Sequence, residues 1–173
     1  MNGRSFALSA LLGLLLVAGA GRAEEPPGGK LTGKVRLVGS GPSRSAALEV
    51  SPREAYDLRG PLAAELARVP GARIAAEGAV SGEGKRRTLE VSGYEILDVG
   101  GGIKPFVGTI RVDEGFVYLD VTSCQCTRVL TGKASNKFAD QTGAKVWVSG
   151  IEKENNVLEV LRSGILSEPG DDQ

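Results

Sequence analysis

Apolar and polar residues alternate in short stretches along most of the chain. Leu31, Val35 and Leu37 are separated by polar or small residues, and the same alternation returns many times further on. A period of two predicts strands that bury one face. We predict ten strands, at residues 31–38, 47–51, 55–58, 73–80, 88–97, 107–112, 116–121, 127–130, 145–151 and 156–166.

Two segments between strands have a helical pattern instead. In the first, Pro61 suits the first position of a helix, and Leu62 and Leu66 lie four residues apart on one side of it. Pro70 and Gly71 then end the helix. The second segment is a helical turn at residues 134–140 that carries Phe138. The order of three strands, a short helix and two strands therefore occurs twice.

The two halves also share glycines and apolar positions. Three glycines of the first half have a counterpart 72 positions later: Gly60 and Gly132, Gly71 and Gly143, Gly78 and Gly150. This repeat predicts a duplicated all-β unit, with domains at residues 30–98 and 105–168, a glycine-rich linker at 99–104 and a tail at 169–173. The element order is that of the OB-fold, a five-stranded, partly open Greek-key barrel. A single sandwich of eight or ten strands is the alternative.

Units of under 70 residues are marginally stable alone, so we expect the two barrels to share an interface. The second copy contains, in order, Gly108-Thr109-Ile110, the segment from Gly143 to Gly150, and Leu158-Glu159-Val160. These motifs resemble those of exported bacterial proteins of the OB-fold type. This resemblance exists at fold level and implies a fold and a compartment. It implies no catalytic residue.

The first 23 residues are typical of a signal peptide. Arg4 precedes an apolar run from Ala7 to Val17, and small residues follow at two possible cleavage sites. The run is short for a membrane span, although an uncleaved N-terminal anchor is an alternative. Residues 24–29 form a flexible lead-in of Glu, Pro and Gly. We therefore expect a periplasmic or secreted protein with no integral membrane segment after cleavage.

Charge and composition argue against several classes of function. The chain has 21 basic and 21 acidic residues, without the basic surplus of a nucleic-acid binder, so no nucleic-acid partner is expected. It contains no histidine, the commonest proton shuttle near neutral pH and the commonest transition-metal ligand. No nucleophile elbow or phosphate-binding glycine loop occurs. We expect no enzyme, no catalytic residues, no cofactor and no metal site.

Cys124 and Cys126 form the most reactive-looking feature. In an oxidising compartment two cysteines usually pair. Residues two apart on a flat strand are near the upper limit for a disulfide, so a bridge here requires a bend. Separate or intermolecular thiols, a soft-metal site and redox catalysis are the alternatives, with Asp120 and Asp140 as the nearest acidic residues.

The face of strands two and three, with the loops after strands one and four, is the usual binding surface of an OB-fold. In the first copy this region carries the candidate ligand-binding cations Arg44, Arg53, Lys85, Arg86 and Arg87. The matching loops of the second copy, at 113–115 and 152–156, are acidic. The loops are either solvated tips or sites for an anionic ligand or for docking.

Trp147 is expected to point outward from its strand, either into a contact between the two units or as a platform for ligand stacking. Taken together, these features favour an exported, non-enzymatic binding or interaction protein. Its partner is unknown: an envelope saccharide, a small anionic ligand or another protein. A thiol-redox or soft-metal-handling protein centred on the two cysteines is the alternative.

Overall fold

The computed structural model describes residues 29–41, 44–84 and 87–170. The predicted signal peptide at 1–23, most of the lead-in, and the candidate residues Lys85 and Arg86 lie outside the described residues. Within the described ranges, no helix has the length and apolar character needed to cross a bilayer.

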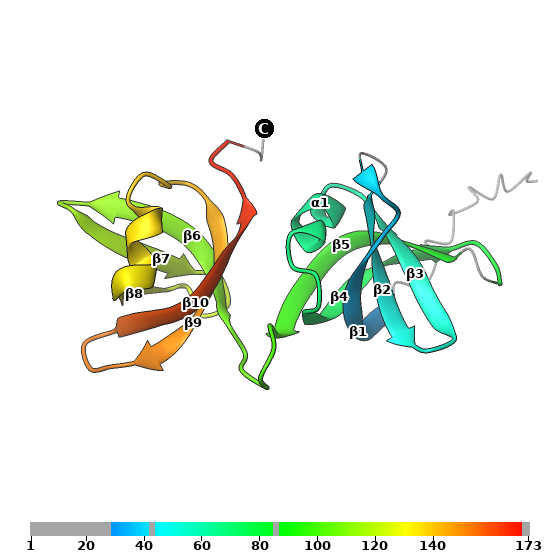
Figure 1. Cartoon of the computed structure of the whole chain (residues 1–173), viewed down its shortest axis with the longest axis horizontal. Helices are drawn as coiled ribbons and strands as arrows, with labels where there is room; N and C mark the ends of the chain where they lie inside the picture. Colours follow the sequence, from blue (N-terminus) through cyan, green and yellow to red (C-terminus); the bar gives the residue numbers. More distant parts are fainter. Residues whose placement is uncertain (1–28, 42–43, 85–86, 171–173) are drawn as a thin grey trace, which may run out of the picture.

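The chain forms two closed five-stranded barrels in tandem (Figure 1). The first contains β1 (Gly29–Val38), β2 (Ser45–Ser51), β3 (Glu54–Arg59), β4 (Arg73–Ser81) and β5 (Arg87–Asp98). The second contains β6 (Phe106–Asp113), β7 (Phe116–Val121), β8 (Cys126–Thr131), β9 (Lys145–Glu152) and β10 (Val157–Ser167). The predicted fold class is thereby confirmed, and the single-sandwich alternative is wrong.

Strand order is the same in both barrels. It runs β1-β2-β3-β5-β4 in the first and, in equivalent positions, β6-β7-β8-β10-β9 in the second. The third strand pairs with the fifth in parallel, and the first strand closes the barrel on the fourth. Closure leaves neither sheet with a long free edge.

The helical segments differ between the barrels. Residues Leu62–Ala67 form the α-helix α1, whereas Lys133–Phe138 form a 3-10 helix, η2. The composition explains the difference, because Ala and Leu dominate α1 while η2 contains Ser135 and Asn136, whose side chains compete for backbone hydrogen bonds. The hydroxyl of Ser135 donates to the carbonyl oxygen of Gly132 at 2.7 Å. The helix expected in each barrel is thus an α-helix only in the first.

Each barrel wraps its own apolar core. Leu48, Leu66 and Ile74 are fully buried in the first, and Leu119, Phe138 and Val146 are fully buried in the second. A repeated pair of hydrogen bonds ties the helix end to the first strand. Gly71 N–H donates to Val35 O, and Val35 N–H donates to Ala72 O, both at 2.8 Å. The second barrel repeats the pair with Gly143, Ile110 and Ala144, at 2.8 and 2.9 Å.

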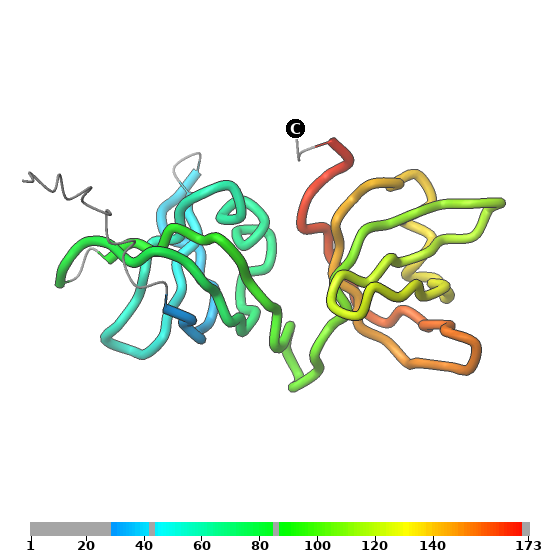
Figure 2. Tube along the Cα trace, turned by 180° about the vertical axis from the view of Figure 1, so that it is seen from behind, coloured from blue at the N-terminus to red at the C-terminus, as the bar shows by residue number. Residues whose placement is uncertain are grey.

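The barrels also contact each other. Leu166, near the end of β10, is buried in the apolar cluster of the first barrel, and Val107 and Trp147 pack against that cluster. Figure 1 shows α1 and the end of β10 on the facing sides of the two barrels. The linker passes along one side of this junction (Figure 2). Arg162 holds the linker by donating to the carbonyl oxygens of Val99 and Gly100, each at 2.9 Å.

Candidate functional site

A groove of about 840 Å³ lies on the outer face of the first barrel. Its floor is formed by β1, β2 and β3, and Gly84 and Arg87 border it from the β4–β5 hairpin. The lining residues are Arg36, Val38, Ala47, Glu49, Ser51, Pro52, Arg53, Glu54, Ala55, Gly84 and Arg87. This is the face that the OB-like strand order predicts for ligand binding.

Both carboxylates of this groove are already paired with cations. Arg36 forms an ion pair with Glu49. Arg87 donates to Glu54 Oε1 at 2.6 Å and to the Tyr56 hydroxyl oxygen at 3.2 Å, and that hydroxyl donates to Glu54 at 2.7 Å. The hydrogen bond to Tyr56 and the nearby Glu54 carboxylate raise the pKa of Arg87 above its usual value. Arg87 is therefore a permanently charged and well-oriented cation.

Unlike Arg36 and Arg87, Arg53 has no partner among the described side chains. It is exposed at the turn between β2 and β3 and forms no ion pair or hydrogen bond with any of them. The structure thus brings two of the predicted cations, Arg53 and Arg87, into one groove. Arg44 is exposed just before β2 and lies outside the lining residues.

A second groove, of about 460 Å³, adjoins the first at Glu49. Its lining includes Lys34 of β1, Arg73 of β4 and Asp98 at the end of β5. Asp98 accepts hydrogen bonds from the backbone N–H groups of Gly100 and Gly102, at 2.7 and 3.2 Å, which hold its carboxylate in the linker turn. Asp98 is also the cross-strand neighbour of Arg73. Lys34 and Arg73 are exposed and unpaired within the part of the chain that the structure describes.

The equivalent face of the second barrel is filled by its own side chains. Arg111 occupies the position of Arg36, but its cross-strand neighbour is Tyr118, whereas that of Arg36 is Ala47. The Arg111 guanidinium lies 4.6 Å from the centre of the Tyr118 ring. It also pairs with Asp113 at 3.8 Å and Asp120 at 3.2 Å. Because Arg111 already contacts Tyr118, Asp113 and Asp120, its positive charge is not available to a ligand on this face of the second barrel.

A polar cluster joins the two barrels at their junction. Glu65 of α1 is buried and accepts hydrogen bonds from the Tyr94 hydroxyl and, at 2.7 Å, from Lys145 Nζ of β9. The same Nζ lies 5.1 Å from the centre of the Tyr94 ring. A cavity of about 310 Å³ lies alongside, lined by residues of both barrels that include Tyr94, Lys145, Val107 and Ile96.

Trp147 is half-buried at this junction. It is the cross-strand neighbour of Gly164, and its indole covers that glycine so closely that a Cβ there would collide with the ring. Because Trp147 also packs against the cluster containing Leu166, the structure places it in the inter-barrel contact. Its use as a ligand platform stays a prediction.

Cys124 and Cys126 are joined in a disulfide, with Cα atoms 5.2 Å apart. The required bend is present, because Gln125 between them has a positive φ of 51°. Cys124 is exposed at the tip of the β7–β8 hairpin. Among the described residues, no group of three or more Cys, Asp or Glu side chains could hold a metal ion.

Comparisons with known proteins add little to this picture. No family model matches the chain, and no curated protein matches its sequence. Similar solved structures include yeast Ssd1, a pseudonuclease, at 11% identity and a TM-score of 0.30, over 80% of this chain and 23% of that chain. Another is the tetrameric p202 HIN2, at 11% identity and a TM-score of 0.23, over 82% of this chain and 92% of that chain. These values are too low to carry an argument about function.

Sequence reasoning missed several residues of these sites. Arg36, Glu49 and Lys34 lie on strands, where alternation marks them only as solvent-facing. Aligning the two copies provides one usable signal, since Ala47 and Tyr118 occupy equivalent positions and differ greatly in size. No local pattern indicates that Glu65 is buried or that Lys145 is its partner, because the two residues are 80 positions apart.

Proposed function

We propose that this chain is an exported, non-enzymatic binding protein whose first barrel binds an anionic ligand in the groove over β1, β2 and β3. The observation that carries the proposal is the state of the charges in that groove. Its two carboxylates, Glu49 and Glu54, are each paired with an arginine, while Arg53 has no such partner in the described part of the chain. An incoming carboxylate, sulfate or phosphate therefore meets unneutralised positive charge.

The geometry supports this function in two further ways. Arg87 is held by Glu54 and Tyr56, so little side-chain freedom is lost when it contacts a ligand. The floor is lined by the small residues Ala47 and Ala55, which leave room for a ligand to approach the strands. Export is supported by the signal-peptide pattern at residues 1–23. The groove is open to solvent, so we expect modest, salt-dependent affinity.

The test is a titration of the mature protein with galacturonate, followed by amide chemical shifts, with uncharged galactose as the matched probe. We expect saturable shifts around Arg53 and Arg87 with galacturonate only, weakening as ionic strength rises. Arg53→Ser should reduce the affinity, whereas Arg59→Thr, which removes a cation from the other end of the same strand pair, should not. Equal binding of galactose, or equal affinities of the two variants, would count against the proposal.

The disulfide supports a second candidate, thiol–disulfide exchange. Exposed disulfides are the more easily reduced ones, and Cys124 is exposed. In such a reaction an external dithiol is oxidised to a disulfide while Cys124 and Cys126 are reduced to two thiols. Replacing both cysteines by serine separates the two candidates. Unaltered anion binding and stability in that variant, with no exchange by the parent protein, would eliminate the thiol function.

A further inference from the structure

The cations of the first barrel extend beyond the groove that contains Arg53. The two grooves described above meet at Glu49, and their linings together contain five cations and three carboxylates. Glu49 and Glu54 are paired with arginines, and Asp98, the cross-strand neighbour of Arg73, accepts hydrogen bonds from two backbone N–H groups. Five cations and three carboxylates leave a net charge of 5 − 3 = +2. The surplus of positive charge therefore runs from one groove into the other.

Strand register shows the direction of this band. Cross-strand neighbours follow one another across four strands in the order Arg73, Lys34, Glu49, Ala55. Such neighbours place their side chains on the same face of a sheet. Three steps between strands of about 4.8 Å each give a row of roughly 14 Å. Arg73 and Lys34 lie at one end of the row, and Arg53 and Arg87 border the other end.

This spacing does not match a small anion. A single carboxylate or phosphate can contact the cations at one end of the row but not those at both ends. Between the ends lie Glu49, whose charge is balanced by its ion pair with Arg36, and the small exposed side chain of Ala55. A ligand that uses the whole row must be extended and must carry negative charge at intervals along its length.

The lining residues also distinguish between kinds of polyanion. Single-stranded nucleic acids gain much of their affinity by stacking bases on exposed aromatic rings. Neither groove has an aromatic residue among its described lining residues. A chain of acidic sugars needs charge contacts and hydrogen bonds to hydroxyl groups, which arginine and lysine provide.

We infer that the ligand of the first barrel is a linear uronic-acid polysaccharide that crosses the row of strands from Arg53 and Arg87 to Lys34 and Arg73. This inference rests on the proposed function, because it specifies the ligand of the same site. Sugar carboxylates contact the two ends of the row, and the middle of the chain passes over the Glu49–Arg36 ion pair and Ala55.

The test compares galacturonate with its linear trimer and hexamer by calorimetry on the mature protein. Once one carboxylate of the hexamer is bound at one end of the row, binding of another carboxylate at the other end is intramolecular. The hexamer should therefore bind at least about tenfold more tightly than the monomer. Removing both distal cations in Lys34→Thr/Arg73→Thr should weaken the hexamer about tenfold, as expected for two exposed charge contacts, and leave the monomer unchanged. A fully methyl-esterified hexamer, which has no charge, should lose the binding.

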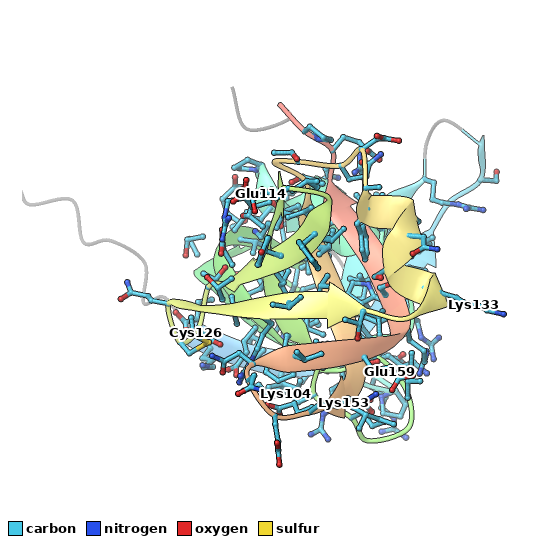
Figure 3. All side chains as sticks on the ribbon, turned by 90° about the vertical axis from the view of Figure 1, so that its left-hand side faces the viewer. Lys104, Glu114, Cys126, Lys133, Lys153 and Glu159 are labelled. Carbon is cyan, nitrogen blue, oxygen red and sulfur yellow. A yellow bond between two sulfur atoms is a disulfide. The ribbon has the colours of Figure 1, made fainter. Side chains whose placement is uncertain are left out.

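A variant with the same loss of charge elsewhere, Arg59→Thr/Lys133→Ser, is the control. Arg59 lies outside both grooves, and the Lys133 side chain points away from the second barrel (Figure 3). Circular dichroism would verify that both double variants are folded. Equal affinity for monomer and hexamer, or equal effects of the two double variants, would overturn the inference while leaving anion binding at Arg53 intact.

Two other outcomes are also decisive. If a single-stranded oligothymidylate of similar charge binds more tightly than the hexamer, the polysaccharide inference is overturned in favour of a nucleic acid. If no galacturonate species binds and Arg53→Ser changes nothing, the proposed function itself fails, and the inference fails with it.

Discussion

The two barrels have the same strand order and similarly built cores, yet their equivalent outer faces differ in one decisive pair of residues. In the first barrel Arg36 faces Ala47, and the surface is hollowed into a groove. In the second barrel Arg111 faces Tyr118, whose ring it covers while pairing with Asp113 and Asp120. The fold provides the surface twice, but only side chains on the strands decide whether it is available to a ligand.

The largest loss of stability is expected from substitutions at two equivalent glycines, Gly78 in the first barrel and Gly150 in the second. A Cβ at Gly78 would collide with the carbonyl oxygen of Glu90, and one at Gly150 with that of Glu159. Gly78→Ala and Gly150→Ala should each lower the free energy of unfolding by about 3 kcal/mol through this overpacking. Urea denaturation measures the change. Gly93→Ala, where no atom lies within 4 Å, is the control. A tolerated alanine at either position would show that the two barrels are not equivalent there.

A smaller loss of stability is expected when the ion pair between the two barrels, Glu65–Lys145, is broken. Lys145→Met leaves buried Glu65 without its cation, which should destabilise the protein by about 1–3 kcal/mol because the lysine is 27% exposed. Adding Glu65→Gln should restore part of the loss. Thermal unfolding by calorimetry would also reveal whether the barrels then melt separately.

Lys153→Met is the matched control for that experiment. Lys153 pairs with Glu159 at 2.6 Å on the exposed side of the second barrel, where Figure 3 shows the two side chains together. An exposed pair of this kind contributes little to stability. If Lys145→Met costs no more than Lys153→Met, the inter-barrel ion pair does not hold the junction together.

The difference between the two faces can be tested directly by filling the open one. Ala55 is exposed on the groove floor, so Ala55→Tyr should block the ligand and weaken galacturonate binding about tenfold or more. Ala64→Tyr places the same ring on the exposed side of α1, outside the groove, and should leave binding unchanged. Tyr118→Ala should open the second barrel without creating an anion site, because Asp113 and Asp120 still neutralise Arg111. Anion binding gained by Tyr118→Ala would contradict this account.

The smallest effect concerns the end of the linker. Lys104 donates to Glu95 at 2.6 Å, and this contact lowers the pKa of Glu95 below its usual value. A depressed carboxyl pKa contributes stability above the unfolded-state pKa, and that stability is lost as pH falls through the folded-state pKa. Glu95→Gln should therefore lower the melting temperature slightly at neutral pH and leave it unchanged in acid. A difference that persists in acid would point to lost packing instead.

Much of the fold could be predicted from the sequence because its signals are local. Alternation located the strands, and the paired glycines at 72-residue intervals revealed the duplication. The structure gives those glycines a physical reason. Gly71 and Gly143 have positive φ angles of 88° and 90°, and a Cβ at Gly78 or Gly150 would meet the adjacent strand. The helix type of η2 was not predicted, since it depends on side-chain hydrogen bonds over a single turn.

The candidate site could be predicted only in part. Two of its cations, Arg53 and Arg87, follow from the loop positions that the barrel order implies. Their neighbours Arg36, Lys34 and Arg73 could not be predicted as site residues. Period-two alternation indicates that a residue faces solvent, but it does not indicate which residues lie next to it on the neighbouring strands. The inter-barrel cluster depends on contacts between residues about 80 positions apart, which no local pattern reports.

The burial of Leu166 makes the two barrels depend on each other. Leu166 lies on β10 of the second barrel, seven residues before Gln173, yet it belongs to the apolar cluster of the first barrel. Without β10, the second barrel would lack one of its five strands, and the apolar cluster of the first barrel would be exposed where Leu166 now packs. β10 therefore contributes to the apolar cores of both barrels, so the folding of the first barrel is coupled to that of the second.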